Sequence, residues 1–339
     1  MDVQTDLGVT RLTFADGLLI ELLAALERTA KGGLVALTAP SAIADDLERW
    51  CRLTENALVD ATPMSEGTRF VVRHGPAPKE ESRPLGERLW IYANFDCNLR
   101  CDYCCVRSSP EAPRRDLGLD AYRRIALESP PLGVREFFVT GGEPMLLPYI
   151  RDALAELARV RPTTVLTNGM LLKGERLASL APLAKLPLTF QISLDSPTAE
   201  LHDLHRGRGS WERARRGANA IRDAGFRVRL AATVSSDDDE AAFRRFLDSE
   251  NVAEEDRLVR RIALRGFAEG GIALSRADLV PEITLSDRGV HWHPVGADDA
   301  DLFVTDQIFP LAHAFAAARA AAEREMAFGA RLTSVFHCA

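Results

Sequence analysis

Short apolar runs alternate with amphipathic segments through the middle of the chain. Runs rich in β-branched and aromatic residues predict buried strands at residues 88–95, 136–140, 163–167, 188–194, 228–234 and 258–264. Apolar residues at helical spacing predict helices at residues 119–127, 148–160, 174–183, 210–224 and 238–248. Strands that alternate with helices are typical of parallel βα units. The pattern therefore predicts an α/β fold built on a parallel sheet.

The first 75 residues carry a separate and shorter pattern. It predicts strands at residues 9–14, 34–37 and 68–73 and helices at residues 16–29 and 41–53. A stretch rich in proline, glycine and charge follows at residues 76–87 and has the composition of a linker. We therefore expect a small two-layer α/β domain at residues 1–75, then the linker, then the larger unit from residue 88.

Three cysteines follow the first strand of the larger unit. Cys97, Cys101 and Cys104 are separated by three residues and then by two. Thiolates are the ligands that iron–sulfur clusters and zinc select, and closed zinc sites and ordinary clusters take four protein ligands. Three thiolates would leave one iron of a cubane cluster open to another molecule. A structural zinc ion or a structural cluster is the alternative interpretation.

This CxxxCxxC spacing, with Tyr103 before the last cysteine, resembles the signature of the radical S-adenosylmethionine (SAM) superfamily. The turn at residues 141–144 (GGEP), directly after the second strand, resembles the SAM-binding turn of the same superfamily. The resemblance implies a partial (βα)6 barrel at residues 88–270. It also implies a [4Fe–4S] cluster that reductively cleaves SAM to a 5′-deoxyadenosyl radical, which abstracts hydrogen from a substrate.

The resemblance also implies where the site residues lie. The cysteines would hold the cluster and form the catalytic centre, the tyrosine would lie near the adenine, and the GGE residues would contact the amino group of SAM. Residues after the third and fourth strands would line the ribose side and the rim. The expected site residues are Cys97, Cys101, Tyr103, Cys104, Gly141, Gly142, Glu143, Asn168, Ser193 and Asp195. They all fall at the carboxyl ends of strands, where such barrels place their sites.

The first domain resembles the TusA/SirA family of sulfur carriers, although the supporting pattern is diffuse. Those carriers begin the first helix with a Cys-Pro motif, whereas this chain has Ala15, Asp16, Gly17 and Leu18 there. Without the nucleophilic cysteine no sulfur relay is expected at this position, and Cys51 is expected to be a core residue. We expect a docking or regulatory module.

The remaining cysteines bear on the substrate. Cys105 is expected to be a small buried apolar residue, with a redox role as the alternative. Cys338 alone follows the barrel, which predicts no additional domain for auxiliary clusters. A small metabolite is therefore favoured as the substrate. A peptide or a sulfur-containing substrate is the alternative, as is a non-catalytic iron–sulfur or zinc-binding module.

The last segment, residues 271–339, is expected to cover the barrel with a hairpin and a helix. Residues 282–294 alternate around a turn and predict the hairpin, which puts His291 and His293 on one face. Three roles remain open for this segment: the two histidines could be metal ligands, the hairpin could be a lid that faces the substrate, or it could be a plain surface hairpin. Residues 270–280 are expected to hold a helix, and residues 311–330 form an alanine-rich helical pattern.

Charge and targeting signals narrow the partners. A net charge of −7 argues against nucleic acid as the main partner, although Arg257, Arg260, Arg261 and Arg265 form a local basic cluster that could receive an anionic substrate. We find neither a secretion signal nor a membrane span. We expect an oxygen-sensitive cytoplasmic protein that receives electrons from a donor of the flavodoxin or ferredoxin type.

Overall fold

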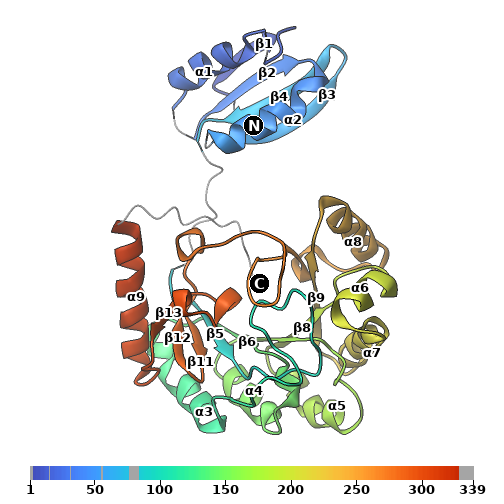
Figure 1. Ribbon diagram of the computed structural model, residues 1–339, viewed down its shortest axis with the longest axis vertical. Coiled ribbons are helices and arrows are strands. Elements are labelled where there is room, and N and C mark those ends of the chain that lie inside the picture. The colour runs from blue at the N-terminus through green and yellow to red at the C-terminus, as the bar shows by residue number, and fades with distance from the viewer. Residues whose placement is uncertain (1–2, 15, 31, 55, 76–83, 328–339) are drawn as a thin grey trace. The chain divides into compact units, whose positions relative to one another are not determined.

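The computed structural model describes residues 3–14, 16–30, 32–54, 56–75 and 84–327 (Figure 1). The chain divides into two compact units, Met1–Arg83 and Pro84–Ala339. The division falls inside the stretch with linker composition at residues 76–87.

The first unit is a four-stranded sheet with two helices. Its elements are β1 (Thr5–Val9), α1 (Leu18–Arg28), β2 (Leu34–Ala39), α2 (Ala44–Leu53), β3 (Ala57–Met64) and β4 (Gly67–Arg73). The strand order is β1-β2-β4-β3, with β1 parallel to β2 and β4 antiparallel to both of its neighbours. This is the two-layer α/β arrangement that the pattern predicts. The likeness to sulfur carriers stays a prediction.

A single apolar core joins both helices of the first unit to its sheet. Leu22 of α1, Leu47 of α2 and Phe70 of β4 are fully buried in it. Cys51 lies in the same core, as expected, and its burial raises the pKa of the thiol to about 11. The expected first strand at residues 9–14 is wrong, because the strand occupies Thr5–Val9 instead. The strand Ala57–Met64 was not predicted.

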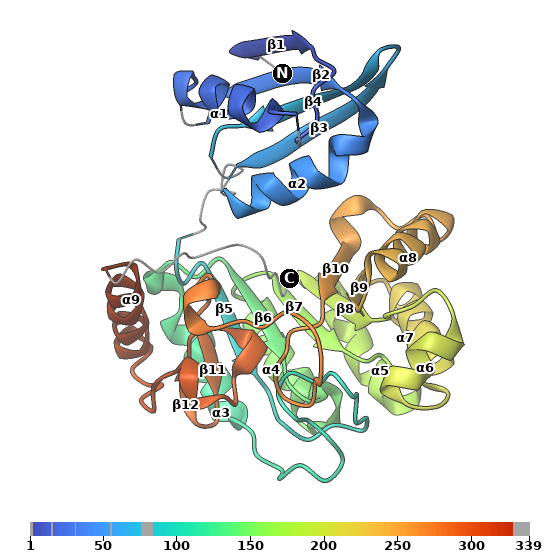
Figure 2. The ribbon, with the colours of Figure 1, turned by 45° about the horizontal axis from the view of Figure 1, so that its top comes forward.

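The second unit is built on six parallel strands in sequence order (Figure 2). They are β5 (Arg88–Tyr92), β6 (Glu136–Thr140), β7 (Thr163–Thr167), β8 (Leu188–Ser193), β9 (Arg227–Val234) and β10 (Arg257–Arg261). The short strands β11 (Thr284–Ser286), β12 (Gly289–His291) and β13 (Phe303–Thr305) extend the sheet beyond β5. The six predicted strands and the parallel α/β fold are confirmed, in keeping with a partial barrel.

Helices cover the outer face of this sheet. They are α3 (Leu119–Glu128), α4 (Ile150–Ala158), α5 (Gly174–Leu180), α6 (Ala199–Arg206), α7 (Ser210–Asp223), α8 (Asp237–Ser249) and α9 (Leu311–Ala327). Residues alternate along β5, so Leu89 and Ile91 belong to the core between sheet and helices, whereas Trp90 and Tyr92 line the interior cavity. No helix among the described residues is long and apolar enough to cross a membrane.

The C-terminal segment differs in part from expectation. The predicted hairpin is present as β11 and β12, but residues 270–280 contain one 3-10 turn, Arg276–Asp278, rather than a helix. Helix α9 packs against α3, β12 and β13, so it extends the outer helical layer and is not a cover over the strand ends. Residues 328–339, including Cys338, lie outside the described residues.

Candidate active site

The segment after β5 folds back on itself and brings the three cysteines to the carboxyl ends of the strands. Asp96 forms an isolated bridge with Ser109, and the amide of Cys97 donates to the Ser109 carbonyl at 3.1 Å. The amide of Cys104 donates to the carbonyl of Cys101 at 3.2 Å. These local hydrogen bonds fix a compact loop without regular secondary structure, which lets three thiols face one space.

That space is a cavity of about 170 Å³ at the centre of the barrel. Eight of the ten predicted site residues line it: Cys97, Cys101, Tyr103, Cys104, Gly141, Gly142, Asn168 and Ser193. They come from four segments that are far apart in the sequence, and the parallel sheet brings them together because each follows or ends a strand. Cys105, Arg206 and Arg260 also line the cavity.

The thiols suit an iron–sulfur cluster by their surroundings. The amide of Leu99 donates to the sulfur of Cys97 at 3.4 Å, and the amide of Ser108 donates to the sulfur of Cys104 at 3.3 Å. Such hydrogen bonds to ligand sulfurs are among the features by which proteins tune a cluster. Burial raises the pKa of the Cys97 thiol well above its ordinary value and that of Cys101 to about 11.

Among the described residues, no group of three or more His, Cys, Asp or Glu side chains is arranged to hold one metal ion. A cubane cluster does not require such convergence, because it places each protein sulfur on a different iron. The shared cavity, the amide donors and the count of three thiols thus fit a cluster with one iron open to a second ligand.

Glu143 lies behind the cavity wall rather than in it. Its carboxylate is fully buried and accepts hydrogen bonds from the amide of Met145 at 2.9 Å, the hydroxyl of Thr167 at 2.7 Å and the amide of Asn168 at 2.8 Å. Burial raises its pKa. The side chain therefore joins the GGEP turn to the turn after β7, which holds Asn168 at the cavity. The expected contact of Glu143 with SAM stays a prediction.

Asp195 is also a buried support. Its carboxylate accepts two hydrogen bonds from Arg206, one at 3.1 Å, and others from the hydroxyl of Tyr103 and the amide of Thr233, the latter at 3.0 Å. Burial alone would lower the pKa of the Arg206 guanidinium. The neighbouring Asp195 carboxylate raises it by more, so the net pKa of Arg206 is raised. The Asp195 carboxylate thus fixes two side chains that line the cavity, Tyr103 and Arg206.

The two glycines of the GGEP turn are required by packing. A Cβ on Gly142 would lie 2.2 Å from the carbonyl oxygen of Asp96, and one on Gly141 would lie 2.7 Å from that of Asn94. Asn94 itself donates to the carbonyls of Asp96 and Glu143, each at 3.0 Å. The glycines therefore let the turn after β6 lie directly against the segment that leads into the cysteine loop.

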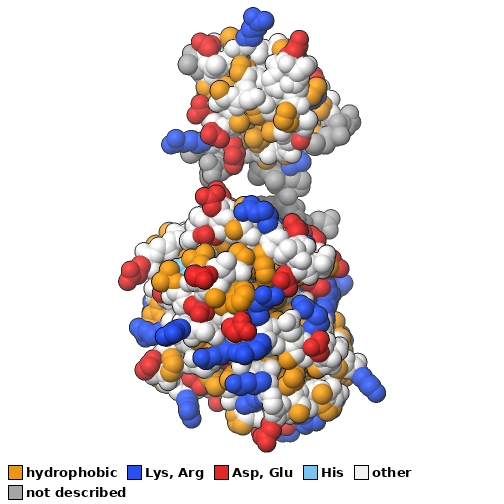
Figure 3. Space-filling model, turned by 90° about the vertical axis from the view of Figure 1, so that its right-hand side faces the viewer, with side chains coloured by type: hydrophobic (Ala, Val, Ile, Leu, Met, Phe, Trp, Pro, Cys, Tyr) orange, Lys and Arg blue, Asp and Glu red, His pale blue; other side chains and the backbone are white. Residues whose placement is uncertain are grey.

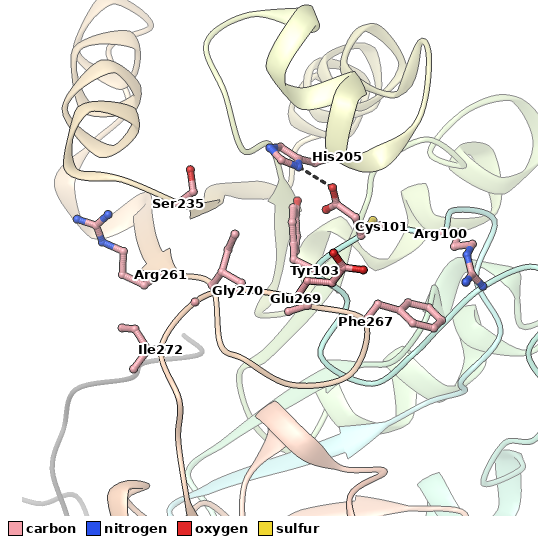
Figure 4. A pocket seen from close by; sticks show the side chains of 14 residues that line it. Arg100, Cys101, Tyr103, His205, Ser235, Arg261, Phe267, Glu269, Gly270 and Ile272 are labelled. Atoms are coloured by element: carbon pink, nitrogen blue, oxygen red, sulfur yellow. Dashed lines mark hydrogen bonds and ion pairs between the residues drawn. The ribbon is translucent and has the colours of Figure 1, made fainter.

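A larger chamber of about 940 Å³ adjoins this cavity (Figure 4). Cys101, Tyr103 and Arg261 line both spaces. The outer wall is the loop after β10, including residues 267–272. This loop is held against the cysteine loop by the amide of Phe267, which donates to the Cys104 carbonyl at 2.9 Å, and by the guanidinium of Arg100, 4.4 Å from the Phe267 ring centroid.

One acid–base pair that was not predicted from the sequence faces the chamber. His205 Nδ1 lies 2.8 Å from the carboxylate of Asp102, and both residues line the chamber. The Asp102 amide also donates to the His205 carbonyl at 3.1 Å. His205 lies in the last turn of α6, a helix that is absent from the predicted elements. Its proximity to Asp102 across the fold carries no sequence signal.

The other candidates have ordinary surroundings. His291 is buried with Nε2 3.0 Å from the hydroxyl of Ser286, and His293 is buried and accepts from the Val295 amide, so neither faces a substrate as a lid. The expected basic cluster is largely paired: Arg257 with Asp248 and Glu254, Arg261 with Asp237 and Glu240, and Arg265 with Asp299 and Asp301.

Comparisons with known proteins agree on the larger unit. Residues 93–248 match the sequence profile of the Radical SAM superfamily. The chain is 33% identical to the antilisterial bacteriocin subtilosin biosynthesis protein AlbA of Bacillus subtilis over 42% of this chain and 33% of that protein. It is 28% identical to an AdoMet-dependent heme synthase of Nitratidesulfovibrio vulgaris, over 48% and 45% of the two chains.

A third relative is a probable GTP 3′,8-cyclase of Aeropyrum pernix, 32% identical over 49% of this chain and 47% of that protein. Among solved structures, SuiB of Streptococcus suis bound to S-adenosylmethionine has a TM-score of 0.47 and 23% identity, covering 58% of this chain and 45% of that chain. The chain spans a third to a half of the length of these curated relatives. Residues 93–248 therefore form a radical SAM domain, and proteins of that family use a [4Fe–4S] cluster and SAM.

Proposed function

We propose that this protein uses a cluster held by Cys97, Cys101 and Cys104 to cleave SAM and to abstract a hydrogen atom from a substrate in the adjoining chamber. When bound, the cluster supplies one electron, and SAM supplies the 5′-deoxyadenosyl radical. One observation carries the proposal: all three thiols line one cavity that shares Cys101 and Tyr103 with a chamber large enough for a substrate.

The remaining residues bind and orient within this scheme. The backbone of Gly141 and Gly142, together with Asn168 and Ser193, offers polar groups along the cavity wall. Arg206 gives that wall a buried positive charge, which suits the carboxylate of an amino acid such as the methionine part of SAM. The loop at residues 267–272 separates the chamber from solvent on one side, which helps to exclude water from the reaction.

We favour a small metabolite as the substrate. The chamber of about 940 Å³ falls within the range of small-molecule sites, roughly 300–1,000 Å³. It offers apolar contacts from Phe267 and Ile272 and an acid–base pair at Asp102 and His205. Because the three thiols must stay reduced, the proposal also places the protein in the cytoplasm and predicts sensitivity to oxygen.

A peptide is the second candidate, and two observations favour it. The relative AlbA is named for bacteriocin biosynthesis. In addition, Glu269, Gly270 and Gly271 line the chamber, and within the described part of the chain their amides donate to no backbone carbonyl, so we propose these amides as donors to an extended peptide. A sulfur-containing substrate rests only on the likeness of the first unit to sulfur carriers.

The test is anaerobic reconstitution with iron and sulfide, followed by incubation with SAM and dithionite and measurement of 5′-deoxyadenosine. The proposal predicts a brown protein that forms 5′-deoxyadenosine, and loss of both properties in Cys101→Ala. Cys51→Ala is the matched control, because that thiol is buried in the first unit and should leave both unchanged. A colourless, zinc-loaded protein would instead support the binding-module alternative.

A further inference from the structure

The proposed function needs a source of electrons, because the cluster must be reduced before it acts. We infer that the exposed face of α7 is the docking site for a small acidic protein that carries one electron, of the flavodoxin or ferredoxin class. The inference rests on the proposed function. The carrier loses one electron and the cluster gains it, and no atom or proton is transferred.

The inner face of α7 lies directly against the cavity wall. A Cβ on Gly217 would lie 2.0 Å from the carbonyl oxygen of Gly169, and one on Gly169 would lie 3.3 Å from the carbonyl oxygen of Ala214. Gly169 follows Asn168, which lines the cavity and donates to the side chain of Asn98 at 2.8 Å, next to Cys97. The helix backbone therefore touches the turn that borders the cluster position.

This packing also implies a short distance between a carrier bound to α7 and the cavity. An α-helix with its side chains is about 10–12 Å across. A carrier seated on the outer face of α7 would thus be separated from the cavity wall by about one helix diameter. Short separations favour electron tunnelling, so this face is a suitable entry point.

The segment that contains α7 also carries a net positive charge. Residues 207–223 contain five arginines and two acidic residues, a net charge of +3 in a chain whose net charge is −7. Arg208, Arg213 and Arg216 are exposed and have no carboxylate partner within the described ranges. Figure 3, which views the side where α6, α7 and α8 lie, shows blue side chains in a row across this part of the unit. Complementary charge steers protein encounter and raises the rate of association.

The cysteine loop itself is less suited to an acidic partner. Residues 96–116 contain four arginines and four acidic residues and so have no net charge. Two of its arginines are paired with the C-terminal segment: Arg107 with Asp299 at 3.2 Å, and Arg115 with Asp287 and Asp298. Leu204 on the neighbouring helix α6 is 73% exposed and adds an apolar contact beside the basic face of α7.

The test measures cluster reduction rather than turnover. The reconstituted full-length protein is mixed anaerobically with purified reduced flavodoxin in a stopped-flow instrument, and bleaching of the cluster absorbance is followed. In Arg213→Glu/Arg216→Glu we expect reduction at low salt to be about tenfold slower than in the unmodified protein, because the basic face steers the acidic carrier. The difference should disappear in high salt, because salt screens exposed charges. Reduction by dithionite should be unchanged.

The matched control is Arg151→Glu/Arg159→Glu, which makes the same change of charge at two exposed positions, one in α4 and one directly after it. Arg213→Gln/Arg216→Gln should give an intermediate rate, and it keeps the test valid if the first variant folds poorly. Equal flavodoxin rates for the α7 and α4 variants would overturn the inference. Absence of a reducible cluster with dithionite in the unmodified protein would refute the proposed function, and the inference with it.

Discussion

Replacement of Asp195 by asparagine tests the buried pair beneath the cavity. The carboxylate is 5% exposed and accepts from Arg206, Tyr103 and the amide of Thr233. An asparagine side chain would be neutral, so the guanidinium of Arg206, which is 9% exposed, would stay buried without a counter-charge. Removal of one partner from a buried ion pair costs about 3 to 5 kcal/mol. We expect Asp195→Asn to lose that much free energy of unfolding.

The assay is urea unfolding followed by tryptophan fluorescence. Because Trp50 lies in the first unit, the measurement is made in a Trp50→Phe background, so that the remaining tryptophans report on the second unit alone. The control is Asp237→Asn, which removes an exposed partner of Arg261. Exposed ion pairs contribute about 0 to 1 kcal/mol. A loss in Asp195→Asn no larger than that of the control would refute the reasoning.

Three further predictions follow from single positions. Gly217→Ala should lower the free energy of unfolding by about 1 to 3 kcal/mol, because the new methyl group would meet the carbonyl oxygen of Gly169 in the turn after β7. The control Gly270→Ala has open space around it and should change the free energy of unfolding little. Chemical unfolding of both variants measures the difference. Burial lowers the pKa of His291 to about 4. An unfolded histidine titrates near about 6.5, so stability should be lost as pH falls from about 6.5 toward 4, by up to about 3 kcal/mol from this group. His291→Gln should reduce the loss measured between pH 7 and pH 5, and the exposed control His313→Gln should not. Glu143→Gln should retain the brown cluster but weaken SAM binding, because the buried carboxylate positions the cavity wall. Calorimetry measures the SAM affinity, and an affinity equal to that of the unmodified protein would contradict this role.

The strands and most of the site could be predicted because two independent signals coincide there. Runs such as residues 136–140 are mostly apolar, as strands buried on both faces must be, and the chemistry-bearing residues follow them at once. The parallel arrangement then brings Cys97, Gly142, Asn168 and Ser193 to one end of the sheet. Sequence order is enough for that inference.

Other features could not be predicted because their cause lies in tertiary contacts. The carboxylates of Glu143 and Asp195 accept hydrogen bonds from donors in other segments, and no sequence pattern indicates these partners. Helix α6 was missed because its buried positions include His202 and Arg206, so its apolar stripe is weak. Strand β3 was missed because it lies at the sheet edge and is exposed in its second half.

The measurement that tests the central claim most directly is 5′-deoxyadenosine formation by the anaerobically reconstituted protein with SAM and dithionite. The account predicts formation of 5′-deoxyadenosine in the unmodified protein, together with iron and sulfide bound in the ratio of a [4Fe–4S] cluster. It predicts neither in Cys101→Ala, whose missing thiol lines both the cavity and the chamber. Undiminished SAM cleavage by Cys101→Ala would contradict the assignment of the three cysteines.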